Sequence, residues 1–234
     1  MPPALAAQDP LAPTRPPGQD ELPCEDGEPM ETPKHRQQMS LLIESLQLHL
    51  ADRPDVFIGG NMAVYYSMLQ VQRMDFRAPD FFVVLGVEPR ERKSWVVWEE
   101  DGRGPDLVIE LLSESTEAND RGVKMRVYAR ALRVPEYYLF DPLTCVLEGY
   151  RLDPERGEYR AMTPGTDGWL GCATLGLRLG VAPGSYQGHR TDWLRWWLPD
   201  GTVLPTGVER AAAAEARVAE LEARLRAMGE RERG

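Results

Sequence analysis

The feature that most constrains the fold is the run LVIELL at residues 107–112. Successive side chains of a strand point to opposite faces of a sheet, and in this run both faces are apolar. Such a strand has to be covered on both sides, which predicts a central position in a layered sheet. The run also contains Glu110, and burying its charge costs free energy unless a partner or a cation compensates it.

The rest of the chain predicts an α/β domain around this strand. Helices are expected where apolar residues recur at helical spacing, at residues 35–51 and 115–132. Strands are expected in short β-branched or aromatic runs, at residues 56–66 with a break at Gly59-Gly60, 81–85, 94–98, 107–112 and 137–140. Residues 146–152 and 158–162 predict a hairpin, and residues 169–204, with four of the six tryptophans, predict a β-rich or irregular cover.

The two ends of the chain differ from its centre. Residues 1–33 hold nine of the 20 prolines, and we expect a disordered proline-rich leader at residues 1–20, followed by the domain at residues 21–205. Residues 206–234 predict an amphipathic helix, because apolar residues recur at spacings of three and four from Ala211 to Met228. We expect this coiled-coil-like helix to reinforce a homodimer. A helix that packs back on its own domain is the alternative.

Composition excludes several classes of protein. With 42% hydrophobic residues the chain can bury a core, and no apolar run approaches the ~20 residues that a membrane span needs. The N-terminus lacks the basic start and apolar stretch of a secretory signal. Cys24, Cys145 and Cys172 are widely spaced and odd in number, which predicts free thiols in the cytoplasm and gives no zinc-binding pattern.

The net charge of −10 argues against a nucleic-acid partner, since such binding depends on neutralising phosphates. Much of the surplus is local, however. Residues 1–33 contribute −6, and residues 34–207 carry only −4. A basic groove within the domain is therefore compatible with the sequence.

Two acids follow a proline and are candidates to act with Glu110. Asp80 opens the expected strand 81–85, and a neighbouring strand can bring it close to Glu110. Asp106 points to the same strand face as Glu110, but four residues at about 3.3 Å each separate them by roughly 13 Å, so one ion cannot bind both. Asp80 and Glu110 are therefore the expected ligands of a divalent cation, which prefers oxygen ligands. Asp106 is expected at the start of its strand or as an assisting group, and a solvated strand face is the alternative for Glu110.

Lys124, on the expected helix 115–132, is the third candidate. Of the 27 basic residues 24 are arginine, so an ordinary surface cation in this chain would more often be arginine. A site that needs a compact ammonium group would keep lysine, and a solvated helix lysine is the alternative. Tyr128 lies one helical step further and is expected to pack beside Lys124.

Two segments together resemble a known family. They are FRAPDFFVVLG at residues 76–86 and PDLVIELLSESTEANDRGVKMRVYARALRVPEYYLFDP at residues 105–142. In order and spacing they resemble the Uma-two family of bacterial putative restriction endonucleases, over roughly residues 21–200. The resemblance implies the fold of the PD-(D/E)XK nucleases, a central mixed β-sheet flanked by helices, with metal-binding acids at Asp80 and Glu110. Leu111 and Leu112 follow Glu110, and at the second of these positions that superfamily usually has a lysine. The resemblance implies that Lys124 takes this role.

The first hypothesis is therefore a Mg²⁺- or Mn²⁺-dependent endonuclease that acts on DNA. In it Asp80 and Glu110 hold the metal, Lys124 orients water or stabilises charge, and Asp106 assists. The second hypothesis is a catalytically inactive nuclease-fold protein with a nucleic-acid-binding or regulatory role, which the acidic balance and the missing in-strand lysine favour. The third is an assembly subunit that acts through its C-terminal helix.

Overall fold

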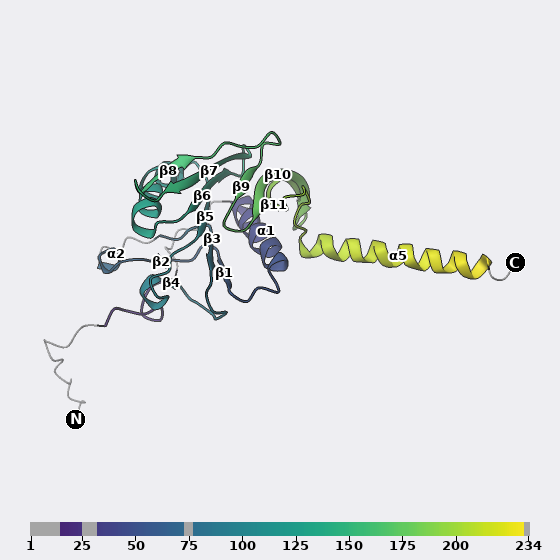
Figure 1. The fold of residues 1–234 in the computed structure, drawn as a ribbon, viewed down its shortest axis with the longest axis horizontal. Coiled ribbons are helices and arrows are strands. Elements are labelled where there is room, and N and C mark those ends of the chain that lie inside the picture. The colour runs from purple at the N-terminus through teal and green to yellow at the C-terminus, as the bar shows by residue number, and fades with distance from the viewer. Residues whose placement is uncertain (1–14, 25–31, 73–76, 232–234) are drawn as a thin grey trace, which may run out of the picture.

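The computed structural model describes residues 15–24, 32–72 and 77–231, and its centre is a six-stranded mixed sheet (Figure 1). The strand order is β1-β3-β5-β6-β7-β8. The bounds are β1 Val56–Gly59, β3 Phe81–Leu85, β5 Leu107–Leu111, β6 Glu136–Asp141, β7 Val146–Asp153 and β8 Glu158–Ala161. β5 pairs antiparallel with β3 and parallel with β6. All residues of β5 are buried, which confirms the central position expected for the LVIELL run.

One face of the central sheet packs against α1 (Pro33–His49) and a second sheet of order β11-β10-β9. The bounds of the second sheet are β9 Leu170–Cys172, β10 Leu177–Tyr186 and β11 His189–Trp197. Trp196 links the layers, because its ring centroid lies 5.8 Å from that of Phe81 and its indole N–H donates to the Leu42 carbonyl. The predicted cover at residues 169–204 is therefore a β-rich layer.

The opposite face of the central sheet is covered by the helical segment 117–132, called the covering helix below. In it α3 (Glu117–Asn119) and α4 (Met125–Val127) alternate with π-helical turns at Asp120–Lys124 and Tyr128–Leu132. Because side chains alternate along β5, Ile109 faces the first core and Val108 the second. Glu110 shares the face of Val108 and therefore lies beneath the covering helix.

Two predicted strands are shorter than expected. The strand expected at residues 56–66 breaks after β1, where Asn61 takes a positive φ of 46°, and extended structure resumes as β2 (Val64–Tyr65). β2 pairs in parallel with β4 (Trp95–Val96), the only part of the expected strand 94–98 that stays extended before a 3₁₀ turn at Val97–Glu99. A short helix, α2 (Met68–Gln72), follows β2 and was not expected.

Residues 15–24 contact the segment around β4. The indole N–H of Trp98 donates to the Pro17 carbonyl at 3.0 Å, and Lys93 Nζ lies 2.6 Å from Asp20 Oδ1. The boundary expected at residue 20 therefore runs through a segment that contacts the domain. Residues 1–14 of the leader expected at residues 1–20 lie outside the described residues.

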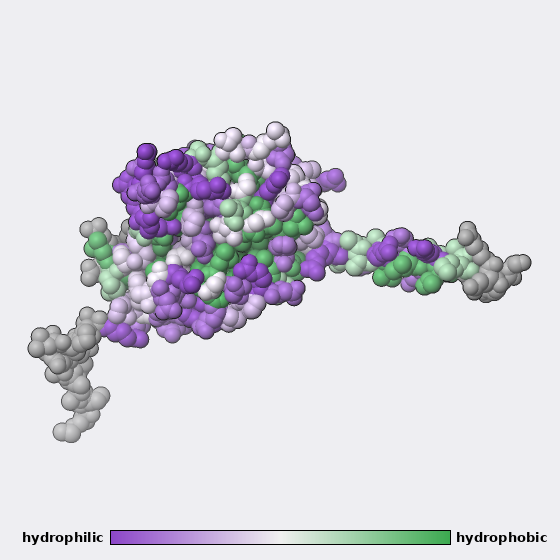
Figure 2. Space-filling model, in the orientation of Figure 1, coloured by the Kyte–Doolittle hydropathy of each residue, from purple (hydrophilic) through white to green (hydrophobic). Residues whose placement is uncertain are grey.

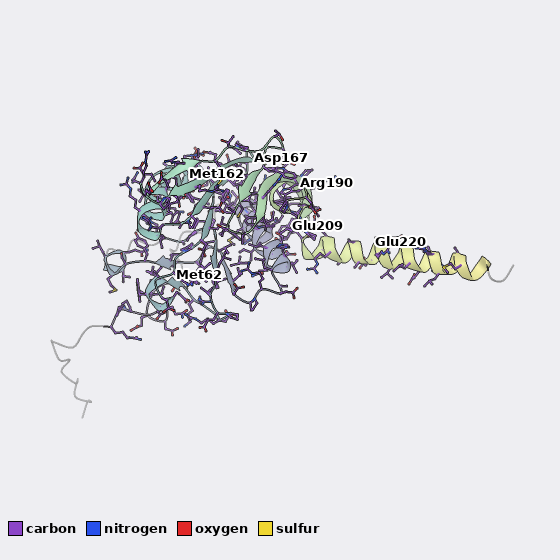
Figure 3. All side chains as sticks on the ribbon, in the orientation of Figure 1. Met62, Met162, Asp167, Arg190, Glu209 and Glu220 are labelled. Carbon is purple, nitrogen blue, oxygen red and sulfur yellow. The ribbon has the colours of Figure 1, made fainter. Side chains whose placement is uncertain are left out.

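The chain continues from β11 into α5 (Gly207–Arg231), which extends away from the body of the molecule (Figure 1). Figure 3 places Glu209 where α5 leaves the body and Glu220 further along the projecting part. This element is the amphipathic helix expected after residue 205. Among the described helices, α5 included, none combines the length and apolar character that a membrane crossing requires.

The packing of α1 on the central sheet generates the first prediction. Leu46 is fully buried between α1 and the sheet. Replacing it with alanine should lower the free energy of unfolding by about 2–5 kcal/mol, because apolar contacts are lost and a cavity remains. Urea unfolding followed by circular dichroism measures this change. Leu143, which is 70% exposed, offers the matched control, and Leu143→Ala should alter stability by less than about 0.5 kcal/mol.

Candidate active site

Asp80 and Glu110 lie opposite each other on neighbouring strands. Phe81 pairs with Ile109 in the antiparallel register of β3 and β5, and one further step places Asp80 opposite Glu110 on the same face. The Asp80 backbone N–H donates to Glu110 Oε2 at 3.2 Å, and Asp80 Oδ2 accepts from the Leu111 N–H at 2.7 Å. The two carboxylates expected to act together are therefore adjacent.

The covering helix brings Lys124 to the same place. Lys124 Nζ lies 3.2 Å from Glu110 Oε2 and 2.8 Å from Asp120 Oδ1. Both acids are buried, whereas the Lys124 side chain keeps 15% of its surface exposed. Asp120 and Lys124 are the first and last residues of one π-helical turn. Distortions of this kind are frequent at functional sites.

Two tyrosines close the site on its inner side. The Tyr128 hydroxyl donates to Glu110 Oε1 at 2.7 Å, and the Tyr137 hydroxyl donates to the Asp120 backbone carbonyl at 3.0 Å. The two rings meet edge to face with centroids 5.3 Å apart. Tyr128 therefore lies beside Lys124 as expected, and it also fixes one oxygen of Glu110.

The site holds more negative than positive charge. Burial raises the pKa of Glu110 to about 8, and the neighbouring Asp80 and Asp120 act in the same direction against the opposing effect of Lys124. Burial likewise raises the pKa of Asp80, although Lys124 and the Leu111 N–H oppose the shift. Burial would lower the pKa of Lys124, but the three carboxylates outweigh it and raise that pKa, so the ammonium group stays charged.

Asp80 and Glu110 are the residues that could hold a divalent cation. Their oxygens are the donors that Mg²⁺ and Mn²⁺ prefer, and one lysine does not neutralise three buried acids. Within residues 15–24, 32–72 and 77–231 no cluster of three or more Asp, Glu, His or Cys side chains is preformed as a metal site. The donor set therefore fits an ion held by two carboxylates together with water and a substrate phosphate, the usual mode for Mg²⁺.

The structure does not bring Asp106 to this site. Its Oδ2 accepts the Leu85 N–H at 2.8 Å, and its own N–H donates to the Val83 carbonyl at 2.8 Å. These bonds hold the end of β3 to the start of β5, at the opposite end of β5 from Leu111. The assisting role considered for Asp106 is therefore not supported by its position, and its contacts match the expected place at the start of the strand.

Sequence reasoning missed Asp120 as a member of the site. Its spacing of four residues from Lys124 was visible in the sequence, but helices contain many such pairs and most of them are exposed. The distinguishing feature is burial, since Asp120 is only 1% exposed beneath the sheet-facing side of the covering helix. That burial depends on how the helix docks, which the local sequence does not encode.

Comparison with known proteins identifies a family. The family model Uma2, described as "Putative restriction endonuclease", matches residues 23–182. The chain belongs to the Uma2 family. The matched region contains Asp80, Glu110 and Lys124 and ends before α5. The family suggested by the sequence motifs is thereby confirmed.

This Uma2 protein is also similar to one curated sequence and to one solved structure. An uncharacterized protein of Synechocystis sp. (strain ATCC 27184 / PCC 6803 / Kazusa) is 30% identical over 128 residues, which is 53% of this chain and 63% of the relative, so less than two thirds of that protein is matched. A crystal structure described as a putative nuclease belonging to DUF820 from Anabaena variabilis ATCC 29413 aligns with a TM-score of 0.45 at 18% identity. The alignment covers 68% of this chain and 90% of the Anabaena chain.

The charge surplus generates the second prediction, for protein kept free of divalent cations with EDTA. The pKa of Glu110 is raised from its ordinary 4.5 to about 8, so between these values the folded state holds more protons than the unfolded state. Stability conferred by the protonated acid is fully present below pH 4.5 and is lost as the pH rises towards 8. Glu110 contributes at most about 1.4 kcal/mol per pH unit to this fall.

Glu110→Gln removes this titration because an amide stays neutral. Urea unfolding at several pH values should therefore give a flatter dependence of stability on pH in the variant than in the wild type, although Asp80 still contributes to the slope. Glu91 is exposed, and Glu91→Gln should keep the wild-type slope. Equal slopes in wild type and Glu110→Gln would show that Glu110 does not hold a proton in the folded chain.

Proposed function

We propose that this protein is a metal-dependent endonuclease that hydrolyses phosphodiester bonds in DNA, with Mg²⁺ or Mn²⁺ as its cofactor. The observation that carries the proposal is the buried pair Asp80 and Glu110 on facing strand positions, with Lys124 Nζ 3.2 Å from Glu110. Membership of a family described as putative restriction endonucleases supports a nuclease in general. The metal, the DNA substrate and a cytoplasmic location are the further parts of the proposal.

Each residue of the site has a role in this proposal. Asp80 and Glu110 would hold the cation, which when bound lowers the pKa of a water molecule and stabilises charge on the phosphate. Lys124 keeps its proton and places a compact positive charge where a water molecule or a phosphate oxygen approaches the two acids. Asp120 holds Lys124 in position, and Tyr128 orients Glu110 through its hydroxyl.

Local positive charge on the covering helix supports a nucleic-acid substrate. Arg121, Arg126 and Arg130 lie along it, and Arg126 and Arg130 are exposed. Arg121 and Arg130 form ion pairs with Glu148 and Glu158. The Arg130–Glu158 pair is exposed and therefore weak, so Arg130 can exchange this carboxylate for a phosphate at small cost. Arg121 is held more firmly, because it donates two hydrogen bonds to Glu148 in a half-buried pair.

A second candidate function is a nuclease-fold protein without turnover that binds or regulates nucleic acid. It is favoured by the ion pairs of Lys124 with Glu110 and Asp120, which engage the only lysine of the site. This second function is also favoured by the sequence after Glu110, Leu111 and Leu112, because PD-(D/E)XK nucleases usually have a lysine at the second of these positions. The two functions differ in whether divalent cations produce cleavage.

The third prediction concerns cleavage itself. Purified protein should nick supercoiled DNA or degrade single-stranded DNA with Mg²⁺ or Mn²⁺ and not with EDTA, and Glu110→Gln should lower the rate about 100-fold or more because a metal ligand is lost. Glu91, which is exposed, gives the matched control, and Glu91→Gln should cleave like the wild type. Metal-dependent DNA binding without cleavage would favour the second function.

The fourth prediction separates Lys124 from the metal ligands. Lys124→Ala should abolish turnover yet leave binding of Mn²⁺ largely intact, because Asp80 and Glu110 both remain and lose a competing positive charge. Isothermal titration with Mn²⁺ measures binding, and the DNA assay measures turnover. Cleavage by Lys124→Ala at the wild-type rate would remove Lys124 from the proposed mechanism.

A further inference from the structure

An apolar seam runs along the exposed length of α5. Its larger members are Val218, Leu221, Leu225 and Met228, which are 54%, 42%, 67% and 54% exposed. Ala211 and Ala214 continue the seam towards the body and are also exposed. Figure 2 shows apolar residues gathered along one side of the projecting helix and hydrophilic residues along another. The helix is therefore two-sided, and its own domain does not cover the apolar side.

The base of α5 is fixed to the domain, so the helix projects in a defined direction. Glu209 accepts two hydrogen bonds from the Arg195 guanidinium, at 3.1 and 2.7 Å. Glu209 Oε2 also accepts the Thr206 N–H at 2.7 Å, while Thr206 Oγ1 accepts the Glu209 N–H at 3.3 Å, which is a capping box. The Gly207 N–H donates to Glu44 Oε1 at 2.6 Å. These contacts oppose folding of α5 back onto the domain.

The charges beside the seam distinguish between the ways in which two copies of α5 could pair. With Ala211 at heptad position a and Ala214 at position d, the charged residues at the e positions are acidic and those at the g positions are basic. The e residues are Glu215 and Glu222, and the g residues are Arg210, Arg217 and Arg224. In a parallel pair Arg210 faces Glu215 and Arg217 faces Glu222 of the other helix, so opposite charges meet, while Arg224 faces the uncharged third e position, Gly229. In an antiparallel pair e faces e and g faces g, so like charges meet.

The seam residues also indicate the number of helices. Val218 at position a and Leu221 at position d give a β-branched residue followed by leucine, the combination that favours two strands. Within one helix Arg217 already pairs with Glu220 at 2.7 Å, and Glu222 with Arg226 at 3.7 Å. These pairs are exposed and weak, and therefore do not prevent contacts across a dimer.

We infer that α5 forms a parallel two-stranded coiled coil with the α5 helix of a second copy of this chain. Because α5 leaves the domain at its N-terminal end, a parallel coil holds both domains at the same end. Two candidate active sites would then be available to one nucleic-acid molecule, a consequence that rests on the proposed function. The coil itself does not depend on that function.

Site-specific cross-linking tests the orientation in the full chain, with the exposed Cys24 replaced by serine. In a parallel coil residue 228 of one helix lies beside residue 228 of the other, so Met228→Cys should form disulfide-linked dimers in a glutathione redox buffer at micromolar protein. Ala216→Cys, on the outer f position, is the matched control and should give no disulfide-linked dimer, although the helices still pair. The same result is expected in the Glu110→Gln background, which keeps this test independent of nuclease activity.

Two cross-linking results would overturn the inference. If Met228→Cys cross-links no better than Ala216→Cys, the helices do not pair along this seam. An antiparallel coil would instead place residue 211 beside residue 228. Preferential cross-linking in a mixture of Ala211→Cys and Met228→Cys chains would therefore show that orientation.

Charge reversal tests the recognition between the helices. Glu215→Arg with Glu222→Arg leaves only basic residues at the charged e and g positions. This double substitution should raise the dimer dissociation constant about tenfold or more, because four exposed ion pairs per dimer become repulsive. Adding Arg210→Glu and Arg217→Glu exchanges the two charge rows and should restore association while keeping the composition. Sedimentation measures both, and circular dichroism confirms that α5 stays helical. An unchanged dissociation constant after charge reversal would refute the charge pairing.

Discussion

The structure depends most on how the covering helix compensates a carboxylate placed inside the central sheet. Glu110 is fully buried, and its oxygens contact Lys124 Nζ, the Tyr128 hydroxyl and the Asp80 N–H. Leaving one partner of a buried pair without the other costs on the order of 3–5 kcal/mol. Lys124 and Tyr128 lie one helical step apart on the same side of the covering helix. A shift of the helix by one turn would therefore lose both partners, so the ion pair also fixes the docking of the helix on the sheet.

The positive charge of Lys124 compensates the buried carboxylates only in part. In a purely structural ion pair the two charges would balance. Asp80 and Asp120 bring two more carboxylates to a single ammonium group. Burial is the main cause of the raised pKa values of Asp80 and Glu110, and the neighbouring carboxylates add to the shift. Apolar side chains of similar size at these positions would make the same core at lower cost. In the proposed function, a divalent cation and an anionic substrate would offset this cost beside the partly exposed Lys124.

Much of this could be predicted from the sequence because the relevant signals are local. The LVIELL run indicated a central strand because both of its faces are apolar, and the Pro-Asp before the earlier apolar run at residues 81–85 indicated Asp80. The antiparallel register then placed Asp80 opposite Glu110 without any further signal. The role of Asp120 was missed because it depends on the docking of the covering helix. The break after Gly59 was expected from the Gly59-Gly60 pair, whereas the contacts of residues 15–24 were missed because they depend on partners distant in sequence.

The layer that supports the candidate site also anchors the projecting helix. Arg195 in β11 holds Glu209 at the base of α5, and the next residue, Trp196, packs against Phe81. Phe81 directly follows Asp80, so a short chain of buried contacts connects the start of α5 to the first of the two acids. A flexible linker would only raise the local concentration of a second domain, whereas an anchored helix also sets its direction. Pairing of two such helices would therefore determine how the two sites are oriented as well as how close they lie.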